Sequence, residues 1–459
     1  MSAIIGTRSG LGSAQRRRWL KTLAASGLLA ALERNLAFAQ TAPDYKALVA
    51  IYLQGGNDGE NTLVRYDTAG YANYAAVRSP ASGINIPQSQ LLPIQPASTT
   101  TPFGFHPSCG PLKTLFDQKK LAVVSNVGML TQPLSKATIN AGGQVPANLF
   151  SHPDQQLAMQ SADASGYTRV GWGGRIADRL SAFNPGVLFP ALASTAGQRT
   201  FVEGNSTIPL DVGGFSGLFV GGSGQFQFDS LRDAAIREVL SQDSLNTYDA
   251  GAQLLATRGL SNASVVAPII NNAQSAVPPY FAIQNTELSR WMQTIAMLIE
   301  GRAQTQLKRQ VFFINHGGFD THAGQPFDHE TRLRALSQSL KSFYDALAAL
   351  GMENSVTTFT FSDFGRTFKP ATGAGTDHGW GGCNFVVGGA VKGGDFYGTL
   401  PEQALGGPDD VTSEGRWIPT TSLEQFAAPL VRWLGIGQAD LSYVLPNLGA
   451  FPGPPLGFI

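Results

Sequence analysis

Two histidines and an aspartate follow an apolar run in the stretch "VFFINHGGFDTHAGQ", residues 311–325. The three residues are His316, Asp320 and His322, in a chain that has only six histidines. The two-residue spacing of Asp320 and His322 places both side chains on one side of an extended segment. Imidazole and carboxylate together suit zinc, iron or manganese ions. The stretch therefore indicates either a metal site at the end of a strand or a hydrogen-bonded polar turn.

Polar residues of the same kinds follow other apolar runs. Asp58 follows "LVAIYL" in a glycine turn, Asp363 and Arg366 follow "VTTFTF", and "TDHGW" with Asp377 and His378 comes soon after. Carboxylates gathered in one pocket repel one another unless a cation neutralises them. Each group also has a structural interpretation: Asp58 as a turn cap, Asp363 as a helix cap paired with Arg366, and His378 as a hydrogen-bonded loop residue.

The apolar runs themselves predict strands, and the segments between them predict helices. Leucine and aromatic residues recur at spacings of three and four over residues 333–347 and 288–299, which indicates amphipathic helices. Nearly continuous apolar strands that alternate with such helices are typical of an α/β fold with a mostly parallel sheet covered on both faces. In such a sheet, ligands bind at the carboxyl ends of the strands. The predicted strands are 48–53, 121–127, 311–314, 356–361 and 385–387.

The first 39 residues read as a targeting segment. They carry six basic groups and one acidic group, a net charge of +5, and an apolar stretch over residues 20–32. Arg16 and Arg17 begin a pattern similar to the twin-arginine export signal, and Ala37 and Ala39 supply a small-x-small cleavage pattern. The alternative is a basic amphipathic helix that stays on the domain. We expect folded export to the periplasm or beyond, a partnership with the twin-arginine machinery, and a mature chain from about Gln40.

Residues 40–459 are expected to form one domain, with about 195–285 as an insertion that includes a glycine-rich hairpin or loop over residues 211–228. Because the formal net charge of the whole chain is zero, this part is net negative, which argues against a nucleic-acid partner. It contains no run of 18 apolar residues, so no membrane segment is expected. Two cysteines, Cys109 and Cys383, allow at most one internal disulfide.

The same stretches carry a family resemblance. "LVAIYLQGGNDGENTLV", "LFSHPDQQLAMQ", "GGFDTHAGQ" and "FSDFGRTFKPATGAGTDHGWGGCNFVVGGAVKGGDFYG" together resemble the bacterial secreted family known as domain of unknown function 1501. That family is similar to the alkaline phosphatase and sulfatase superfamily. The resemblance implies an α/β/α sandwich with one or two metal ions at the strand ends, their identity open among zinc, manganese, calcium and iron.

The resemblance also implies roles for individual residues. Asp320 and His322 resemble the Asp/His pair of one metal site, whereas Asp58 resembles the first-strand aspartate of the other. Asp363 and His378 resemble further metal ligands.

Ser151 stands at the place of the superfamily's nucleophile, with His152 and Asp154 beside it. Phe364 stands where the superfamily has a histidine, so that one metal is held weakly, or His152 or His316 replaces that histidine, or the second site is absent.

Two functions follow as hypotheses. The first is an exported metal-dependent hydrolase of phosphate or sulfate esters, small or polymeric. In it Ser151 attacks the ester and Arg366 stabilises charge on the transferred group. The second is a catalytically degenerate secreted protein of the same fold that binds a partner, which Phe364 and the glycine-rich insertion favour.

Overall fold

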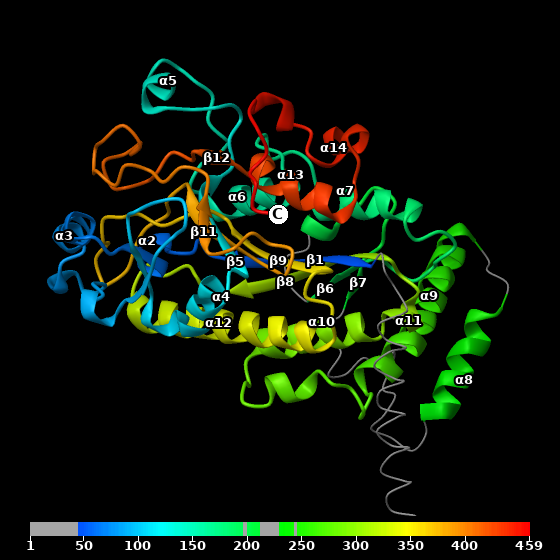
Figure 1. The fold of residues 1–459 in the computed structure, drawn as a ribbon. Coiled ribbons are helices and arrows are strands. Elements are labelled where there is room, and N and C mark those ends of the chain that lie inside the picture. The colour runs from blue at the N-terminus through cyan, green and yellow to red at the C-terminus, as the bar shows by residue number, and fades with distance from the viewer. Residues whose placement is uncertain (1–44, 196–199, 212–228, 243–245) are drawn as a thin grey trace, which may run out of the picture. The chain divides into compact units, whose positions relative to one another are not determined.

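The computed structural model describes residues 45–459 except 196–199, 212–228 and 243–245 (Figure 1). The predicted signal peptide, residues 1–39, lies outside the described residues. So does nearly all of the predicted glycine-rich loop at 211–228. No helix in the described part of the chain is long and apolar enough to cross a membrane.

The main sheet has nine strands in the described residues, and all but β10 run in the same direction. This confirms the prediction of a mostly parallel sheet. In spatial order the strands are β11 (Asp395–Tyr397), β5 (Leu121–Gly128), β10 (Gly382–Val387), β9 (Val356–Ser362), β1 (Lys46–Gln54), β8 (Arg309–Gly317), β6 (Leu192–Ser194) and β7 (Leu210–Asp211), with β12 (Thr421–Ser422) paired to β5.

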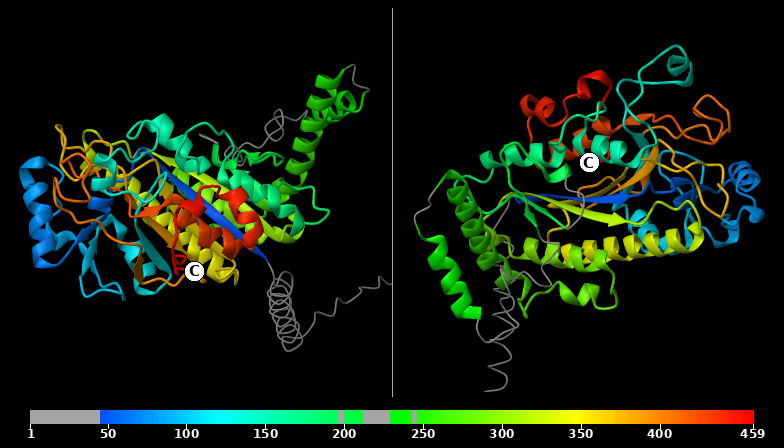
Figure 2. Two further views of the ribbon diagram at one scale, coloured as in Figure 1. Left: turned by 90° about the horizontal axis from the view of Figure 1, so that it is seen from above. Right: turned by 180° about the vertical axis from the view of Figure 1, so that it is seen from behind.

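Helices cover both faces of this sheet, so the expected α/β/α sandwich is confirmed (Figures 1 and 2). One layer consists of α4 (Gly110–Asp117), α10 (Glu287–Glu300) and α12 (Gln325–Ala349). The other consists of α6 (His152–Ser161), α7 (Trp172–Arg179), α13 (Leu423–Leu434) and α14 (Gln438–Val444). The leucine and phenylalanine face predicted over residues 333–347 is buried in α12, as a helix that covers a sheet requires.

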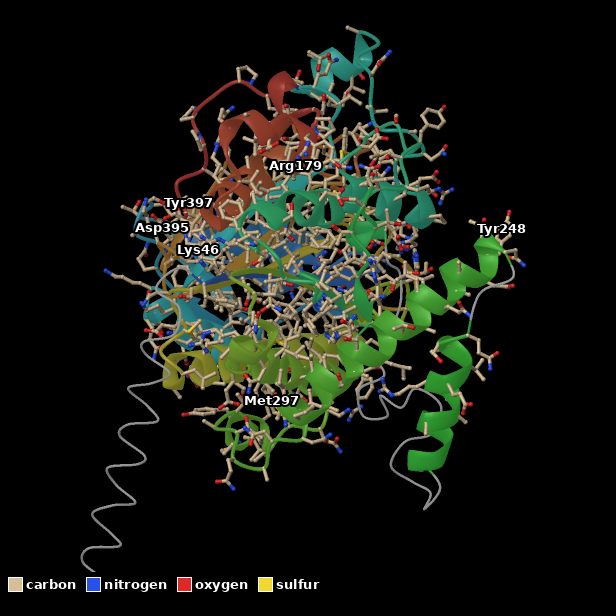
Figure 3. The ribbon with its side chains drawn as sticks, turned by 90° about the vertical axis from the view of Figure 1, so that its right-hand side faces the viewer. Lys46, Arg179, Tyr248, Met297, Asp395 and Tyr397 are labelled. Atoms are coloured by element: carbon tan, nitrogen blue, oxygen red, sulfur yellow. The ribbon has the colours of Figure 1, made fainter. Side chains whose placement is uncertain are left out.

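Smaller elements surround the sandwich. A second sheet contains β2 (Leu63–Arg65), β4 (Phe103–Phe105) and β3 (Leu92–Ile94), with β4 in the middle. The other helices are α2 (Gly59–Thr62), α3 (Thr68–Val77), α5 (Lys136–Asn140), α8 (Asp229–Leu240), α9 (Thr247–Ile270) and α11 (Arg302–Thr305). α9 packs on α10, and its exposed residue Tyr248 lies at its outer end, far from the sheet (Figure 3).

The core between the sheet and the α6/α7 layer is aromatic. Phe313 of β8 is fully buried, and its ring lies 5.0 Å from that of Phe201 and 6.4 Å from that of Phe361, between ring centroids. Trp172 packs edge-on against Phe201 at 4.7 Å. These rings hold β8 and β9 against the helices, and the loops after both strands carry predicted site residues.

Replacing Phe313 by alanine should therefore destabilise the protein strongly. Loss of a buried phenylalanine typically costs about 3–5 kcal/mol, through lost burial and the cavity that remains. Guanidinium-induced unfolding of wild type and Phe313→Ala measures this difference. A loss below about 1 kcal/mol would contradict the packing described here.

Candidate metal centre

Four side chains from three loops meet at the carboxyl edge of the sheet. Asp320 and His322 lie between β8 and α12, and His152 is the first residue of α6. His378 precedes β10. Because β10 runs against its neighbours, its first residues lie at the edge where the parallel strands end. The reversed strand thus returns His378 to the same place as the loop after β8.

The distances among these four residues suit one metal ion. One ligand atom from each lies within 4.8 Å of the others. Asp320 Oδ1 is 3.2 Å from His152 Nε2, 3.0 Å from His322 Nε2 and 3.5 Å from His378 Nε2, and the Nε2 atoms of His322 and His378 are 2.9 Å apart. Ligands at about 2.0–2.1 Å from a tetrahedral zinc ion lie about 3.3 Å apart. The separations therefore bracket those of a tetrahedral site.

The outer nitrogens of two imidazoles are fixed by hydrogen bonds. His378 Nδ1 lies 2.6 Å from the carbonyl oxygen of Phe150, to which it must donate. His152 Nδ1 donates to the Asp363 carboxylate at 2.7 Å. Each bond leaves the Nε2 lone pair free to face the cluster, which is the arrangement of metal-ligating histidines. His152 Nε2 is buried without a hydrogen-bond partner, as expected for an atom that needs a cation.

The segment before α6 is shaped to supply this carbonyl. Phe150 has a φ of 79°, in the left-handed region that a bulky residue rarely adopts, and such strain is found mainly at functional sites. Arg416 lies over the Phe150 ring at 4.7 Å and donates to the carbonyl oxygen of His378 and to Asp377. One guanidinium thus ties the Phe150 segment to the His378 loop.

Asp320 is held in its ionised form. Burial raises the pKa of its carboxyl, but Arg366 and His152 outweigh this effect and lower it. Arg366 is buried and donates to Asp320 at 2.9 Å and to the carbonyl oxygen of Gly55 at 3.1 Å. It therefore pairs with Asp320 and not with Asp363. Any direct action of Arg366 on a substrate remains a prediction.

Protonation and metal binding compete at this cluster. Burial lowers the pKa of His152, but the adjacent Asp363 and Asp320 carboxylates outweigh burial and raise it. Burial dominates at His378 and lowers its pKa. Three imidazole nitrogens and a carboxylate oxygen that face one point need a positive charge between them, either a proton on His152 or a metal ion.

Asp363 lies behind His152 and outside the group of four. Its other acceptor positions take the backbone N–H of Gly55 at 3.2 Å and the side-chain amide of Gln156 at 2.9 Å. The neighbouring Phe364 ring packs 4.8 Å from the rings of both His152 and His378, between centroids. Asp363 and Phe364 thus orient the imidazoles from outside.

The glycine turn after β1 makes this packing possible. Gly55 has a φ of 116°, and a Cβ at this position would lie 2.3 Å from the backbone nitrogen of Asp320. A Cβ on Gly56, whose φ is 88°, would lie 2.7 Å from the Phe364 ring. Only residues without a side chain let the turn pass so close to the cluster.

Asp58 is used elsewhere, which corrects the expectation that the strand ends bring it into the same cluster. It is fully buried and forms a two-point ion pair with Arg78, at 2.7 and 3.0 Å. It also caps α2 by accepting from the backbone N–H groups of Glu60 and Asn61, and it accepts from Gln325 at 2.5 Å. A carboxylate has about four acceptor positions, so Asp58 has none left for a metal.

Two other predicted residues also lie outside the group. His316 is buried, contacts the Phe319 ring and hydrogen-bonds the carbonyl oxygen of Arg332, and burial lowers its pKa to about 4. It is a neutral core histidine. Ser151 directly precedes His152, and its hydroxyl donates to Asp154 Oδ2 at 2.5 Å. Cys109 and Cys383 are both free thiols.

Sequence reasoning missed the residues that support the cluster. The Phe150 carbonyl and the Gln156 amide carry no motif, and Arg416 lies far from its partners along the chain. Asp377 was noticed beside His378, but its pairing with Arg416 was not. The departure at Phe364 did point to His152 as a replacement ligand, and the structure brings His152 into the cluster.

The fold and the site together define an α/β sandwich protein with a candidate metal centre at the carboxyl edge of its sheet. Residues 232–435 match the family described as protein of unknown function (DUF1501). This confirms the family resemblance for that part of the chain. No curated protein matches the sequence.

Some solved structures share a distant similarity with this chain. The C-terminal periplasmic domain of EcEptC from Escherichia coli is 8% identical, with 76% of this chain and 75% of that chain covered and a TM-score of 0.30. PsFucS1 sulfatase from Pseudoalteromonas sp. is 8% identical, with 88% and 71% covered and a TM-score of 0.32. The alkaline phosphatase PafA, as a mutant, is 9% identical, with 72% and 64% covered and a TM-score of 0.28. Similarity of this degree says nothing about a metal or substrate of this chain.

The structural role of Asp58 is testable. Asp58→Asn leaves the buried Arg78 without its counter-charge, which typically costs about 3–5 kcal/mol. Asp67→Asn is the matched control, because Asp67 also caps a helix and pairs with an arginine, but at the surface. Its loss should be below about 1 kcal/mol.

The acid limb of stability should change in the same variant. Burial raises the pKa of Asp58, but Arg78 outweighs it and the pKa is lowered. The pair therefore stabilises the fold above the unfolded pKa of the carboxyl, and this contribution is lost as pH falls through the folded pKa. Urea unfolding from pH 7 to pH 3 should show a smaller pH dependence in Asp58→Asn. An unchanged stability with lost metal would show that Asp58 is a ligand.

Proposed function

We propose that His152, Asp320, His322 and His378 hold one divalent metal ion and that the protein hydrolyses esters of phosphate or sulfate. The observation that supports this most is the convergence of three imidazole nitrogens and a carboxylate oxygen at tetrahedral separations. Zinc fits this ligand set best. Calcium fits poorly, because it prefers oxygen ligands.

A second metal ion has no support in the geometry. Arg78 saturates Asp58, and Asp363 accepts from His152, Gln156 and Gly55. Two carboxylates that the sequence suggested as ligands are thus already neutralised or hydrogen-bonded by the protein. A single metal ion is the arrangement that the described residues support.

A bound metal ion would supply Lewis-acid polarisation of the ester oxygens. Ser151 is the proposed nucleophile, because it directly precedes His152 and its hydroxyl proton already points to Asp154. Its oxygen would bond to phosphorus or sulfur as the ester oxygen leaves, with the serine proton passing to Asp154. Arg366 and Asp363 would keep Asp320 and His152 in place during this step.

The charge of the centre favours a particular substrate. A dication with two guanidinium groups, Arg366 and Arg416, is balanced by three carboxylates, Asp320, Asp363 and Asp377. The net charge is at most +1, and Glu414 on the outer side of Arg416 lowers it further. Both guanidinium groups are bound to carboxylates. The centre therefore suits a singly charged group, such as a phosphodiester or a sulfate monoester, better than a dianionic phosphate monoester.

Export in the folded state by the twin-arginine pathway is part of the proposal. Its support is the pattern at Arg16 and Arg17 followed by Ala37 and Ala39. Loading of a metal before export would agree with that route.

One observation favours the second hypothesis, a binding protein without catalysis. The Ser151 hydroxyl donates to a carboxylate whose pKa is lowered by hydrogen bonds from Ser151 and Asn148. Such a carboxylate is a weak base, so Ser151 is poorly activated in this arrangement.

Metal content and turnover separate the two functions. Asp320→Asn and His378→Gln should each lose bound metal, by about tenfold to a hundredfold in affinity or completely, and Asp328→Asn on exposed α12 surface is the control. Elemental analysis should find one ion per wild-type chain. Ser151→Ala should keep the ion and lose about 10³-fold in turnover of aryl esters. If Ser151→Ala retains all turnover, the nucleophile is wrong; if wild type binds the ion without turnover of any ester, the binding function stands.

The charge argument makes its own prediction. With 4-nitrophenyl leaving groups, kcat/KM for a methyl phosphodiester or for the sulfate should exceed that for the dianionic phosphate by at least about tenfold. Steady-state kinetics at pH 8 measure this ratio. A preference for the dianion would show that further positive charge reaches the site.

A further inference from the structure

A cleft separate from the metal cluster opens between β4, β5 and β11. Its outer chamber has a volume of about 240 Å³. Phe103 and Phe396 form one wall, with ring centroids 4.7 Å apart, and Leu400 and Pro401 are part of the rim. Figure 3 shows Asp395 and Tyr397, the neighbours of Phe396, together on β11. The outer chamber thus offers a flat, apolar space.

A smaller chamber continues inward from the first. It holds about 40 Å³ and shares five lining residues with the outer chamber, among them Ser125 and Gln403. Cys383, Trp417 and Arg366 line its deeper part. A water molecule occupies about 30 Å³ of liquid. The inner chamber therefore has room for a single polar group.

Two buried polar atoms in this inner chamber have no hydrogen-bond partner. Ser125 is fully buried and its Oγ is unpaired, and Asn126, 4% exposed, has an unpaired Oδ1. The Asn126 amide nitrogen donates to the carbonyl oxygen of Ile418 at 2.8 Å, which fixes the direction of the free oxygen. A buried polar atom without a partner costs about 1–3 kcal/mol. Two such atoms in one chamber indicate that a ligand group completes their hydrogen bonds.

The strand is locally distorted to present these atoms. Asn126 has a φ of 49°, and the pairing of β5 with β10 shifts register between Gly382 and Asn384. Bulges of this kind are common beside functional sites, where they redirect side chains. A regular strand would not place Ser125 and Asn126, which are adjacent in sequence, in the same chamber.

The charged groups around the cleft are already paired. Arg65 on the rim pairs with Asp67 at 3.1 Å, and Arg366 at the inner end pairs with Asp320. Glu60 accepts from Trp417 Nε1 at 2.8 Å and from the Gln403 amide. The lining therefore favours an uncharged ligand.

We propose that this cleft binds a small uncharged molecule with a flat aromatic or short aliphatic body and one terminal hydroxyl or N–H group. The body lies between Phe103, Phe396 and Leu400. The terminal group enters the inner chamber, donates to Asn126 Oδ1 and accepts from Ser125 Oγ. The outer volume is below the roughly 300–1,000 Å³ of drug-sized pockets, so the ligand has about one ring.

The site is independent of the proposed ester hydrolysis. Arg366 alone belongs to both places, at the inner end of the cleft and at Asp320. The site therefore stands or falls separately from any bound metal.

The probe is 4-bromophenol, because the anomalous signal of bromine locates it in a crystal of the whole protein. The expected result is a bromine atom in the outer chamber with the hydroxyl toward Ser125 and Asn126. Isothermal titration should give at least tenfold tighter binding of 4-bromophenol than of 4-bromoanisole, which has no donor. Bromine outside the cleft, or only water in it, would overturn the proposal.

Variants test each half of the site. Ser125→Ala removes the hydroxyl without a change of backbone and should weaken 4-bromophenol about fivefold to tenfold while leaving 4-bromoanisole unchanged. Leu400→Trp should fill the outer chamber and abolish binding of both probes. Leu405→Trp is its control, because Leu405 is as exposed as Leu400 and does not line the cleft. Thermal unfolding confirms that all three variants fold. Equal binding to wild type and Leu400→Trp would contradict the site.

Discussion

The candidate centre depends on the mutual repulsion of four electron-rich atoms that face one point. Three imidazole nitrogens and one carboxylate oxygen lie 2.9–3.5 Å apart where measured, without a donor hydrogen for every pair. The chain holds them there from outside, by hydrogen bonds to the far nitrogens of His152 and His378 and by the Arg366 ion pair to Asp320. A positive charge at the centre of the four removes the repulsion, and the surrounding structure is arranged for one.

The buried carboxylates show how the chain distributes its charges. Asp58 and Asp363 follow β1 and β9 at the same edge, yet neither faces the group of four. Arg78 neutralises Asp58 inside the protein, whereas Asp363 fixes the ring of His152. One aspartate thus stabilises the fold and the other orients a ligand. The two tasks explain why the described residues form a site for one ion and not for two.

The bulge in β5 has a comparable effect on the other side of Arg366. A positive φ at Asn126 turns two neighbouring polar side chains into one small chamber instead of opposite faces of a strand. The cost of these unpaired buried atoms is not offset by any other described contact. The metal cluster and the cleft therefore share a physical basis, in that each leaves polar atoms incomplete at the carboxyl edge of the sheet.

Sequence alone determined the elements and the chemistry at their ends. The apolar runs around Val311 and Val356 could only be buried strands, since each is nearly free of polar residues, and the leucine spacing over 333–347 could only be one face of a helix. Asp320, His322 and His378 followed from residue type and their place after or near such runs. Tertiary structure alone decided which acids meet, because a buried carboxylate goes to whichever partner lies nearest in space. Arg78, the Phe150 carbonyl and Arg416 reach their partners only through folding, and a spacing pattern along the chain cannot contain that information.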